Sequence, residues 1–139
     1  MENIPVTTYR GFSAVSGETT FTQDMADIKN GKHAKLIIKI ASLVAQGKVE
    51  EANHVKKQLP FRTLTANYRE RRLVPSITRY NPVITLDIDD LEEGQLERTR
   101  TLINEDPHTL GSFLSPKRHG YKLFVFMQTE YTRRLYDRL

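Results

Sequence analysis

The sequence predicts an α+β fold, a mostly antiparallel sheet with helices packed on one side. Three observations predict it: short segments rich in β-branched and aromatic residues, longer segments with helical periodicity, and turn residues that separate them. The 139 residues suffice for one domain with a core of its own. We therefore expect a single domain over residues 1–139, or the N-terminal portion of a larger one.

The N-terminal half is expected to begin with a strand and continue in helices. Residues 6–12 (VTTYRGF) are β-branched and aromatic, which is typical of a strand. A helix is expected over residues 22–30, and a clearer one over residues 33–46, where apolar residues recur at helical spacing. Residues 49–59 continue as a more polar helix, and the short connection predicts an antiparallel or sharply angled pair.

The central segment combines two expected strands with an arginine-rich stretch. Residues 61–66 are expected to form a strand, and the stretch that follows, up to Arg79, is either a long loop or an edge hairpin. Residues 83–89 form a further strand. Its alternation places Asp87 and Asp89 on one face and the larger apolar residues on the other.

The C-terminal half alternates between helices and strands. Residues 91–104 are expected to form a helix, with Asp90 and Glu93 as a capping box at its start. The remaining expected elements are, in order, a strand over 109–114, a turn over 115–120, a strand over 121–127 and a helix over 130–139.

The composition excludes several classes of protein. No cysteine is present, so disulfides, thiolate metal sites and cysteine catalysis are excluded. The first residues lack the basic and apolar pattern of a signal peptide, and no apolar run approaches the roughly 20 residues of a membrane-spanning helix. We expect a cytoplasmic protein without a membrane partner.

The charges fall into three alternating blocks. Residues 56–80 are basic, residues 86–106 are acidic, and the chain from residue 117 onward is basic again, within a net charge of +4. An acidic centre between basic segments is the arrangement expected of a metal-assisted site for polyphosphate. The alternative is that each block is the solvated face of an ordinary helix or loop.

Two carboxylates lie two residues apart at the end of the strand over residues 83–89. Asp87 and Asp89 point to the same side, about 7 Å apart, and suit Mg²⁺, which prefers few carboxylates together with water and substrate phosphates. An unpaired Asp87 within an apolar run would cost free energy, which favours a functional role. The alternative is that the acids cap the next helix, which explains Asp90 better than Asp87.

A basic, glycine-containing segment, residues 115–122 (SPKRHGYK), leads into the last expected strand. Its backbone amides, with the side chains around them, could form an anion-binding nest. The candidate phosphate-binding residues are Ser115, His119 and Lys122, with further positive charge from Lys117 and Arg118. The alternative is a β-hairpin turn, with the Lys122 side chain extended at a sheet edge.

The order of these motifs resembles the VirE N-terminal-domain family of Bacteroides-type mobile elements, divergent relatives of archaeo-eukaryotic primases and primase-polymerases. The motifs are Lys57-x-Leu59-Pro60, Leu86-Asp87-Ile88-Asp89, an acidic helix, Asp106-Pro107, Phe113-x-Ser115-Pro116 and Gly120-Tyr121-Lys122. The similarity extends from about residue 35 to the chain end, and it rests on the order and spacing of the motifs.

The resemblance implies a primase-like core for Mg²⁺-dependent nucleotidyl transfer. Asp87 and Asp89 would be the catalytic, metal-binding acids, and the phosphates of the nucleotide would lie at Ser115, His119 and Lys122. Nucleic acid would follow a set of basic side chains: Arg69, Arg71, Arg72, Lys117 and Arg118. The implied partners are nucleic acid, a nucleoside triphosphate, and either a C-terminal helicase-type domain or a separate protein of the same element.

The chain departs from the family pattern in two places. Lys117 and Arg118 stand where the family usually has Ser-Gly. Phosphate would therefore be bound less by backbone amides and more by charged side chains. The third acid of a primase fold is not found, so the transfer site is expected to be incomplete. Two alternatives stay open: a non-catalytic module that binds DNA, RNA or a partner protein through its basic segments, and an interaction domain without nucleic-acid affinity.

Overall fold

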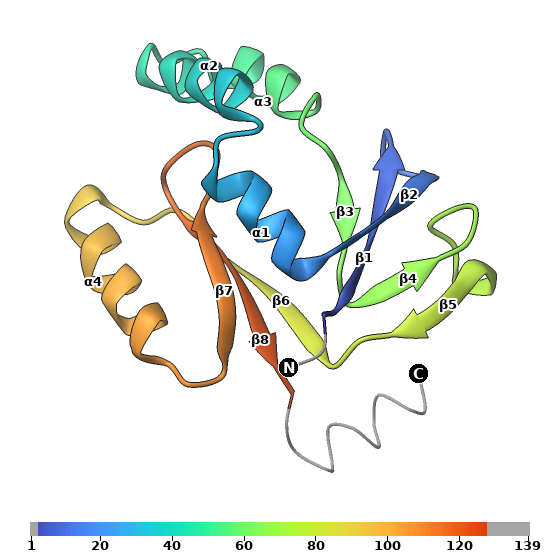
Figure 1. Cartoon of the computed structure of the whole chain (residues 1–139). Coiled ribbons are helices and arrows are strands. Elements are labelled where there is room, and N and C mark those ends of the chain that lie inside the picture. Colours follow the sequence, from blue (N-terminus) through green and yellow to red (C-terminus); the bar gives the residue numbers. More distant parts are fainter. Residues whose placement is uncertain (1–2, 128–139) are drawn as a thin grey trace. The chain divides into compact units, whose positions relative to one another are not determined.

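The computed structural model describes residues 3–127 (Figure 1). The chain divides into two compact units, Met1–Asn81 and Pro82–Leu139, and each described sheet lies within one unit. The α+β class is confirmed, and the named strands pair antiparallel, although they form three small sheets instead of one. The expectation of a single domain stays a prediction.

The strands of the first unit form two sheets. They are β1 (Pro5–Arg10), β2 (Ala14–Thr20), β3 (Arg62–Thr63), β4 (Ala66–Tyr68) and β5 (Ile77–Tyr80), with a 3-10 turn, Val74–Ser76, before β5. In the first sheet, β1 is central and pairs with β2 on one side and β3 on the other. In the second sheet, β4 and β5 form an antiparallel pair, so the arginine-rich stretch is a hairpin.

Strand β2 is an element that the sequence pattern does not reveal. Its residues, AVSGETT, lack apolar alternation, and most of their side chains are exposed. The strand forms because Gly11, at φ +65°, lets the chain reverse after β1. Antiparallel pairing then runs from Arg10 opposite Ala14 to Pro5 opposite Thr20.

The helices of the first unit confirm the expected ones. They are α1 (Phe21–Lys29), α2 (Ala34–Ala45) and α3 (Val49–Lys56). The cap of α1 is Thr20, whose hydroxyl oxygen accepts a hydrogen bond from the Gln23 amide at 3.2 Å, so this helix begins one residue before the expected start. Helices α2 and α3 pack as a pair around a buried core of Ile40, Ala52 and Val55.

Two asparagine side chains connect the strands of the first unit. Asn81 is fully buried, and its Nδ2 donates to the Leu64 carbonyl at 2.7 Å and to Asn67 Oδ1 at 2.9 Å. Asn67 Nδ2 in turn donates to the Pro5 carbonyl at 3.0 Å and to Thr7 Oγ1 at 3.1 Å. Because buried polar groups are costly unless they are hydrogen-bonded, this network fixes β1 against β4 and the residue that follows β5.

The second unit combines a three-stranded sheet with one helix. Its elements are β6 (Val83–Ile88), α4 (Glu93–Glu105), β7 (Thr109–Leu114) and β8 (Tyr121–Phe126). The strand order is β6-β8-β7, and α4 covers one face of the sheet, where Ile103 packs with Tyr121 and Leu123 (Figure 1). The elements expected over residues 83–89, 91–104, 109–114 and 121–127 are confirmed to within two residues at each end.

The start of α4 differs from the expected capping box. Glu92 is the N-cap and forms the box with Gln95, whose Oε1 accepts a hydrogen bond from the Glu92 amide at 3.0 Å. Asp90 and Glu93 do not form the box, because Asp90 lies two residues before the cap and has a left-handed φ of +57°. Asp90 thus belongs to the connection after β6.

The helix expected over residues 130–139 lies outside the described residues. Within the part of the chain that the structure describes, no helix combines the length and the apolar composition needed to cross a membrane.

Candidate functional site

The two principal residues expected at the site are neighbours on adjacent strands of the sheet of the second unit. Asp87 on β6 lies directly opposite Lys122 on β8, and Lys122 Nζ is 3.3 Å from Asp87 Oδ1. The side chains of Asp87 and Lys122 are 53% and 40% exposed, so the ion pair is in contact with solvent. The acid is therefore paired and solvated, and not isolated in an apolar run.

Phe113 extends this row across the sheet. It lies opposite Lys122 on the side away from Asp87, and β8 is the central strand. The hairpin reading of this segment is therefore confirmed, but the expectation that Lys122 lies at a sheet edge is wrong. The Phe113 ring is 6.0 Å from the ring of Phe124, which shares a face with Lys122. An acid, a base and an aromatic ring thus lie side by side.

The basic loop, residues 115–120, lies directly on the end of β6. A Cβ on Gly120 would overlap the carbonyl oxygen of Ile88 and would lie 3.1 Å from the Asp89 Cα. The Leu91 amide donates to the His119 carbonyl at 2.8 Å. Because only glycine allows so close an approach, the backbone joins two motifs that stand far apart in the sequence.

The basic loop uses some of its own amides internally. The Arg118 amide donates to the Ser115 carbonyl, and the Ser115 amide donates to the Gly120 carbonyl, both at 2.8 Å. These two amides therefore do not contribute to the expected anion-binding nest. Arg118 has a φ of +64°, a conformation that glycine adopts at little cost, and it stands where the resembled pattern has glycine. Arg118 and His119 are exposed, and Lys117 is half-buried.

Two carboxylates at the end of β6 could hold a metal ion. Asp87 and Asp89 are both exposed, and Asp89 lies one residue beyond the strand. Over residues 3–127, no three His, Cys, Asp or Glu side chains come together as a metal site. Two solvated carboxylates fit Mg²⁺, which completes its octahedron with water and phosphate oxygens. Lys122 and a metal ion would both interact with the carboxylate of Asp87. The two acids therefore suit a metal ion that is bound to a phosphate, because the phosphate can take the place of Asp87 as the partner of Lys122.

The arginines expected to bind nucleic acid lie in the first unit, on the segment that connects β4 and β5. Arg69 and Arg71 are exposed. Arg72 is also exposed, but its Nε donates to the Phe12 carbonyl at 2.9 Å, and its guanidinium carbon lies 4.8 Å from the centre of the Phe61 ring. The other two expected residues of this class lie in the basic loop of the second unit. The expected nucleic-acid residues therefore form two groups, one in each unit.

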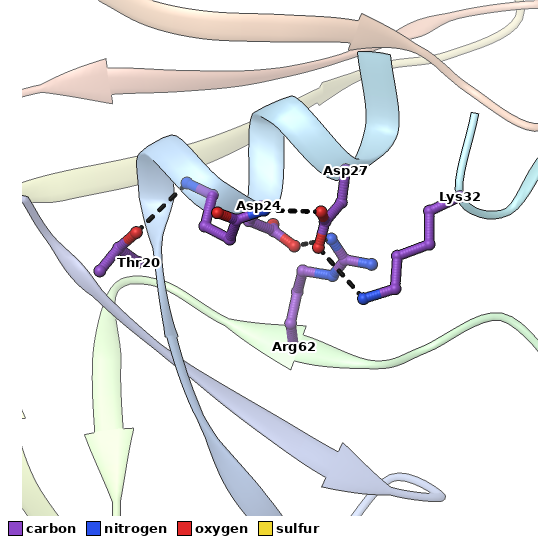
Figure 2. Close-up of polar contacts among 6 residues, drawn as sticks. Thr20, Asp24, Asp27, Lys32 and Arg62 are labelled. Carbon is purple, nitrogen blue, oxygen red and sulfur yellow. Dashed lines mark hydrogen bonds and ion pairs between the residues drawn. The ribbon is translucent and has the colours of Figure 1, made fainter. Parts of the chain in front are cut away.

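A charged cluster on α1 and β3, shown in Figure 2, was missed by sequence reasoning. Asp24 on α1 forms an ion pair with Arg62 on β3, and their side chains are 10% and 20% exposed. Asp27 accepts hydrogen bonds from Gln23 at 2.8 Å and from Lys32 at 3.2 Å, and these bonds lower its pKa. The charges compensate each other and fix α1 on β3. Because Asp24 and Arg62 are 38 residues apart, no local pattern reveals their pairing.

The charges of the same cluster affect the pKa of His33, the residue before α2. Burial lowers its pKa below the ordinary value of 6.5, and the positive charges of Arg62 and Lys32 lower it further. The carboxylates of Asp24 and Asp27 oppose this shift without cancelling it. The imidazole is therefore mostly neutral at pH 7, and it does not cap α2 through a side-chain hydrogen bond.

The comparison with protein families matches residues 54–138, more than half of the chain, to the model of the BT4734-like, N-terminal domain. The chain belongs to this family. The segment matched to the BT4734-like domain contains the Asp87–Lys122 pair, the basic loop and the arginines of the β4–β5 connection, whereas β1, β2, α1 and α2 precede it. Neither a curated protein nor a solved structure matches the chain. The family description names no activity, and the expected relationship to VirE and primase domains stays a prediction.

Proposed function

We propose that this BT4734-like domain is a primase-like domain of a mobile genetic element that binds nucleotides and nucleic acid. The observation that carries the proposal is the Asp87–Lys122 pair, a carboxylate and an ammonium 3.3 Å apart at the sheet surface, with the basic loop folded against the end of the same strand. A nucleoside triphosphate with Mg²⁺ has the complementary charges: anionic oxygens for Lys122 and a divalent cation for Asp87.

The solvated ion pair can open at little cost when such a ligand binds. An exposed pair of this kind contributes at most about 1 kcal/mol, because water already screens both charges. Phosphate oxygens would replace Asp87 as the partner of Lys122, and Asp87 together with Asp89 would then hold the metal. When bound, Mg²⁺ neutralises the phosphates and orients them. The exchange of partners leaves no charge uncompensated.

The basic loop would add side-chain contacts to the phosphates. Ser115 and Arg118 already use their amides within the loop, so the loop cannot hold phosphate mainly through its backbone. We assign this role instead to the hydroxyl of Ser115 and to the side chains of His119, Lys117 and Arg118, of which His119 and Arg118 are exposed. Charged side chains bind phosphate as point charges or as bidentate donors, which tolerates a less regular backbone.

The two acids support nucleotide binding better than nucleotidyl transfer. The resemblance to primases implies a third carboxylate, and the described residues bring no third metal-ligating side chain to Asp87 and Asp89. We therefore propose that transfer requires a carboxylate from outside these residues. It would come from a C-terminal helicase-type domain or from a separate protein of the same element.

Isothermal titration calorimetry with a nucleoside triphosphate, with and without Mg²⁺, tests the proposal. The wild-type chain is expected to bind more tightly with Mg²⁺, and the double variant Asp87→Asn, Asp89→Asn is expected to lose this dependence. The double variant Glu97→Gln, Glu105→Gln, at two exposed positions on α4, removes the same two negative charges elsewhere and is the matched control. Equal Mg²⁺-dependent affinity in the wild type and the double variant of Asp87 and Asp89 would refute the site.

A second candidate function is a binding module that needs neither the metal nor the two acids. The exposed Arg69 and Arg71 favour it. This function predicts nucleic-acid affinity that falls steeply with salt, that ignores Mg²⁺, and that is unchanged by substitution of Asp87 and Asp89. A salt titration of nucleic-acid binding, repeated with Mg²⁺ and with the double variant, separates the two functions.

A further inference from the structure

A continuous row of aromatic rings crosses the first unit and ends in solvent. Tyr9 lies 6.4 Å from Tyr68 and 5.2 Å from Phe61, measured between ring centroids, and Phe61 lies 5.6 Å from Phe12. Tyr68 is at one end of the row, and the adjacent Tyr9 is buried, with its hydroxyl 2.7 Å from Thr63 Oγ1 on β3. Phe12, at the other end, is 50% exposed.

The guanidinium of Arg72 lies over one ring of this row. Its carbon lies 4.8 Å from the centre of the Phe61 ring, and its Nε donates to the Phe12 carbonyl at 2.9 Å. The Arg72 amide also donates to the Ser13 carbonyl at 3.0 Å. Backbone, side-chain and ring contacts thus hold the guanidinium in place, while Arg72 as a whole stays exposed. A fixed, exposed guanidinium plane is a surface on which a planar base can stack.

The segment around Arg72 adds positive charge beside the exposed ring. Residues 70–72 run along the start of β2, where Arg71 forms a β-bridge with Ala14, and the Val15 amide donates to the Glu70 carbonyl at 2.9 Å. Arg71 is exposed, as is Arg69 just before this segment. Residues 69–72 therefore carry three arginines and one acid, Glu70.

Packing alone does not explain the exposed ring. Phe12 lies in the turn between β1 and β2, which Gly11 already forms through its left-handed backbone. Single exposed apolar residues are common, but here Leu73 and Val74, 56% and 77% exposed, follow Arg72 directly. Exposed aromatic and apolar groups among arginines are typical of surfaces that bind single-stranded nucleic acid.

We propose that the aromatic–arginine surface, formed by Phe12, Phe61, Arg71 and Arg72, binds single-stranded nucleic acid by stacking unpaired bases on Phe12 and on the Arg72 guanidinium. Arg71 would contact the phosphates of the same strand. A duplex keeps its base faces stacked inside and could use only the phosphate contacts, so the surface selects single strands. This inference rests on the nucleic-acid part of the proposed function and specifies its substrate class.

The aromatic–arginine surface includes no residue of the acid pair or of the basic loop. Phe12 precedes the segment matched by the family model, whereas Phe61, Arg71 and Arg72 lie within it. All four residues belong to the first unit, and the Asp87–Lys122 pair belongs to the second. Strand binding and Mg²⁺-dependent nucleotide binding can therefore be lost independently of each other.

Fluorescence anisotropy with labelled oligonucleotides tests the inference. The probes are a single-stranded 12-mer of DNA, an RNA of the same sequence and the matching DNA duplex. The wild-type chain is expected to bind single strands more tightly than the duplex. Phe12→Leu keeps an apolar side chain but removes the π-face, and it is expected to weaken single-strand binding about tenfold, whereas Phe12→Trp restores it. Ile38→Leu, on an exposed position of α2, is the matched control and is expected to change nothing.

The salt dependence separates stacking from charge. Arg71→Gln is expected to reduce the slope of log affinity against log salt by about 0.7, whereas Phe12→Leu lowers the affinity and leaves the slope unchanged. The inference is overturned if Phe12→Leu binds like the wild type, or if single strands and duplex bind equally well. The inference is also overturned if the chain binds none of the oligonucleotides, and the surface would then be assigned to a protein partner. In each case calorimetry shows whether Mg²⁺-dependent nucleotide binding, and with it the proposed function, persists.

Discussion

Gly120 lies so close to the carbonyl group of Ile88 that a side chain on Gly120 would overlap its oxygen. The next residue, Tyr121, is paired with Ile88, and the pair after that is Lys122 with Asp87. The contact of Gly120 with Ile88 therefore stands directly beside the candidate site and helps to set the register that brings acid and base together. Loss of this contact would separate the two motifs on which the proposed function depends.

We expect Gly120→Ala to destabilise the second unit. The new methyl group would meet backbone atoms that cannot rotate away, and overpacking of this kind costs about 1–3 kcal/mol. Gly94 in α4 is the matched control, because a Cβ there meets nothing within 4 Å, and Gly94→Ala should leave stability unchanged or raise it. Denaturant unfolding followed by circular dichroism measures both. Equal stability of the two variants would show that the loop does not depend on the close approach.

The ion pair of Asp87 with Lys122 should contribute little to stability. Both side chains are substantially exposed, so a double-mutant cycle with Asp87→Asn and Lys122→Gln is expected to give a coupling energy below about 1 kcal/mol. Denaturant unfolding of the four proteins measures it. A coupling of several kcal/mol would assign the pair a structural role and would weaken its interpretation as a ligand site.

Arg62→Met should destabilise the first unit strongly. The substitution leaves the Asp24 carboxylate without its partner in a site where the two side chains are only 10% and 20% exposed, which costs about 3 kcal/mol. Asp27→Asn, which alters a half-buried acid of the same cluster whose partner Lys32 is exposed, should have a much smaller effect. Thermal unfolding compares the two variants. A larger loss from Asp27→Asn than from Arg62→Met would contradict the assignment of the buried pair.

The stability of the first unit should fall as the pH drops below about 6.5. Burial lowers the pKa of His33 in the folded state, so between the unfolded pKa of 6.5 and the lower folded pKa the unfolded chain binds the extra proton. The free energy that neutral His33 contributes to folding is fully present above pH 6.5. It is lost as the pH falls from 6.5 to the pKa of His33 in the folded state. Urea midpoints at several pH values measure it, and His33→Gln should flatten the dependence. An unchanged pH profile in the variant would show that another group is responsible.

Most helices and strands could be predicted because their signals are local. The apolar spacing of residues 33–46, the alternation of residues 83–89 and the β-branched composition of residues 6–12 each reflect one element. Strand β2 could not be predicted, because its exposed polar residues show no pattern and it depends on β1 for its hydrogen bonds. The cap of α4 differs from the expected one because three acids within four residues, Asp90, Glu92 and Glu93, could each take that position. The left-handed backbone of Asp90 excludes it from the cap.

The candidate site was predictable as a set of residues but not as a geometry. The strand period places Asp87 and Asp89 on one face, yet only the pairing of β6 with β8 shows that Lys122 is the direct neighbour of Asp87. The anion-binding nest was expected from the composition of the loop, whereas hydrogen bonds within the hairpin use the Ser115 and Arg118 amides. Long-range pairings such as Asp24 with Arg62 leave no trace in a single sequence.

The most direct test of the central claim is the binding of a Mg²⁺-nucleoside triphosphate to Lys122→Gln, measured by calorimetry. If Lys122 holds the phosphates, loss of its charge-assisted hydrogen bonds should weaken binding about 10- to 100-fold. Arg98→Gln, which removes a positive charge from an exposed position of α4, should bind like the wild type. Wild-type affinity in Lys122→Gln would contradict the account.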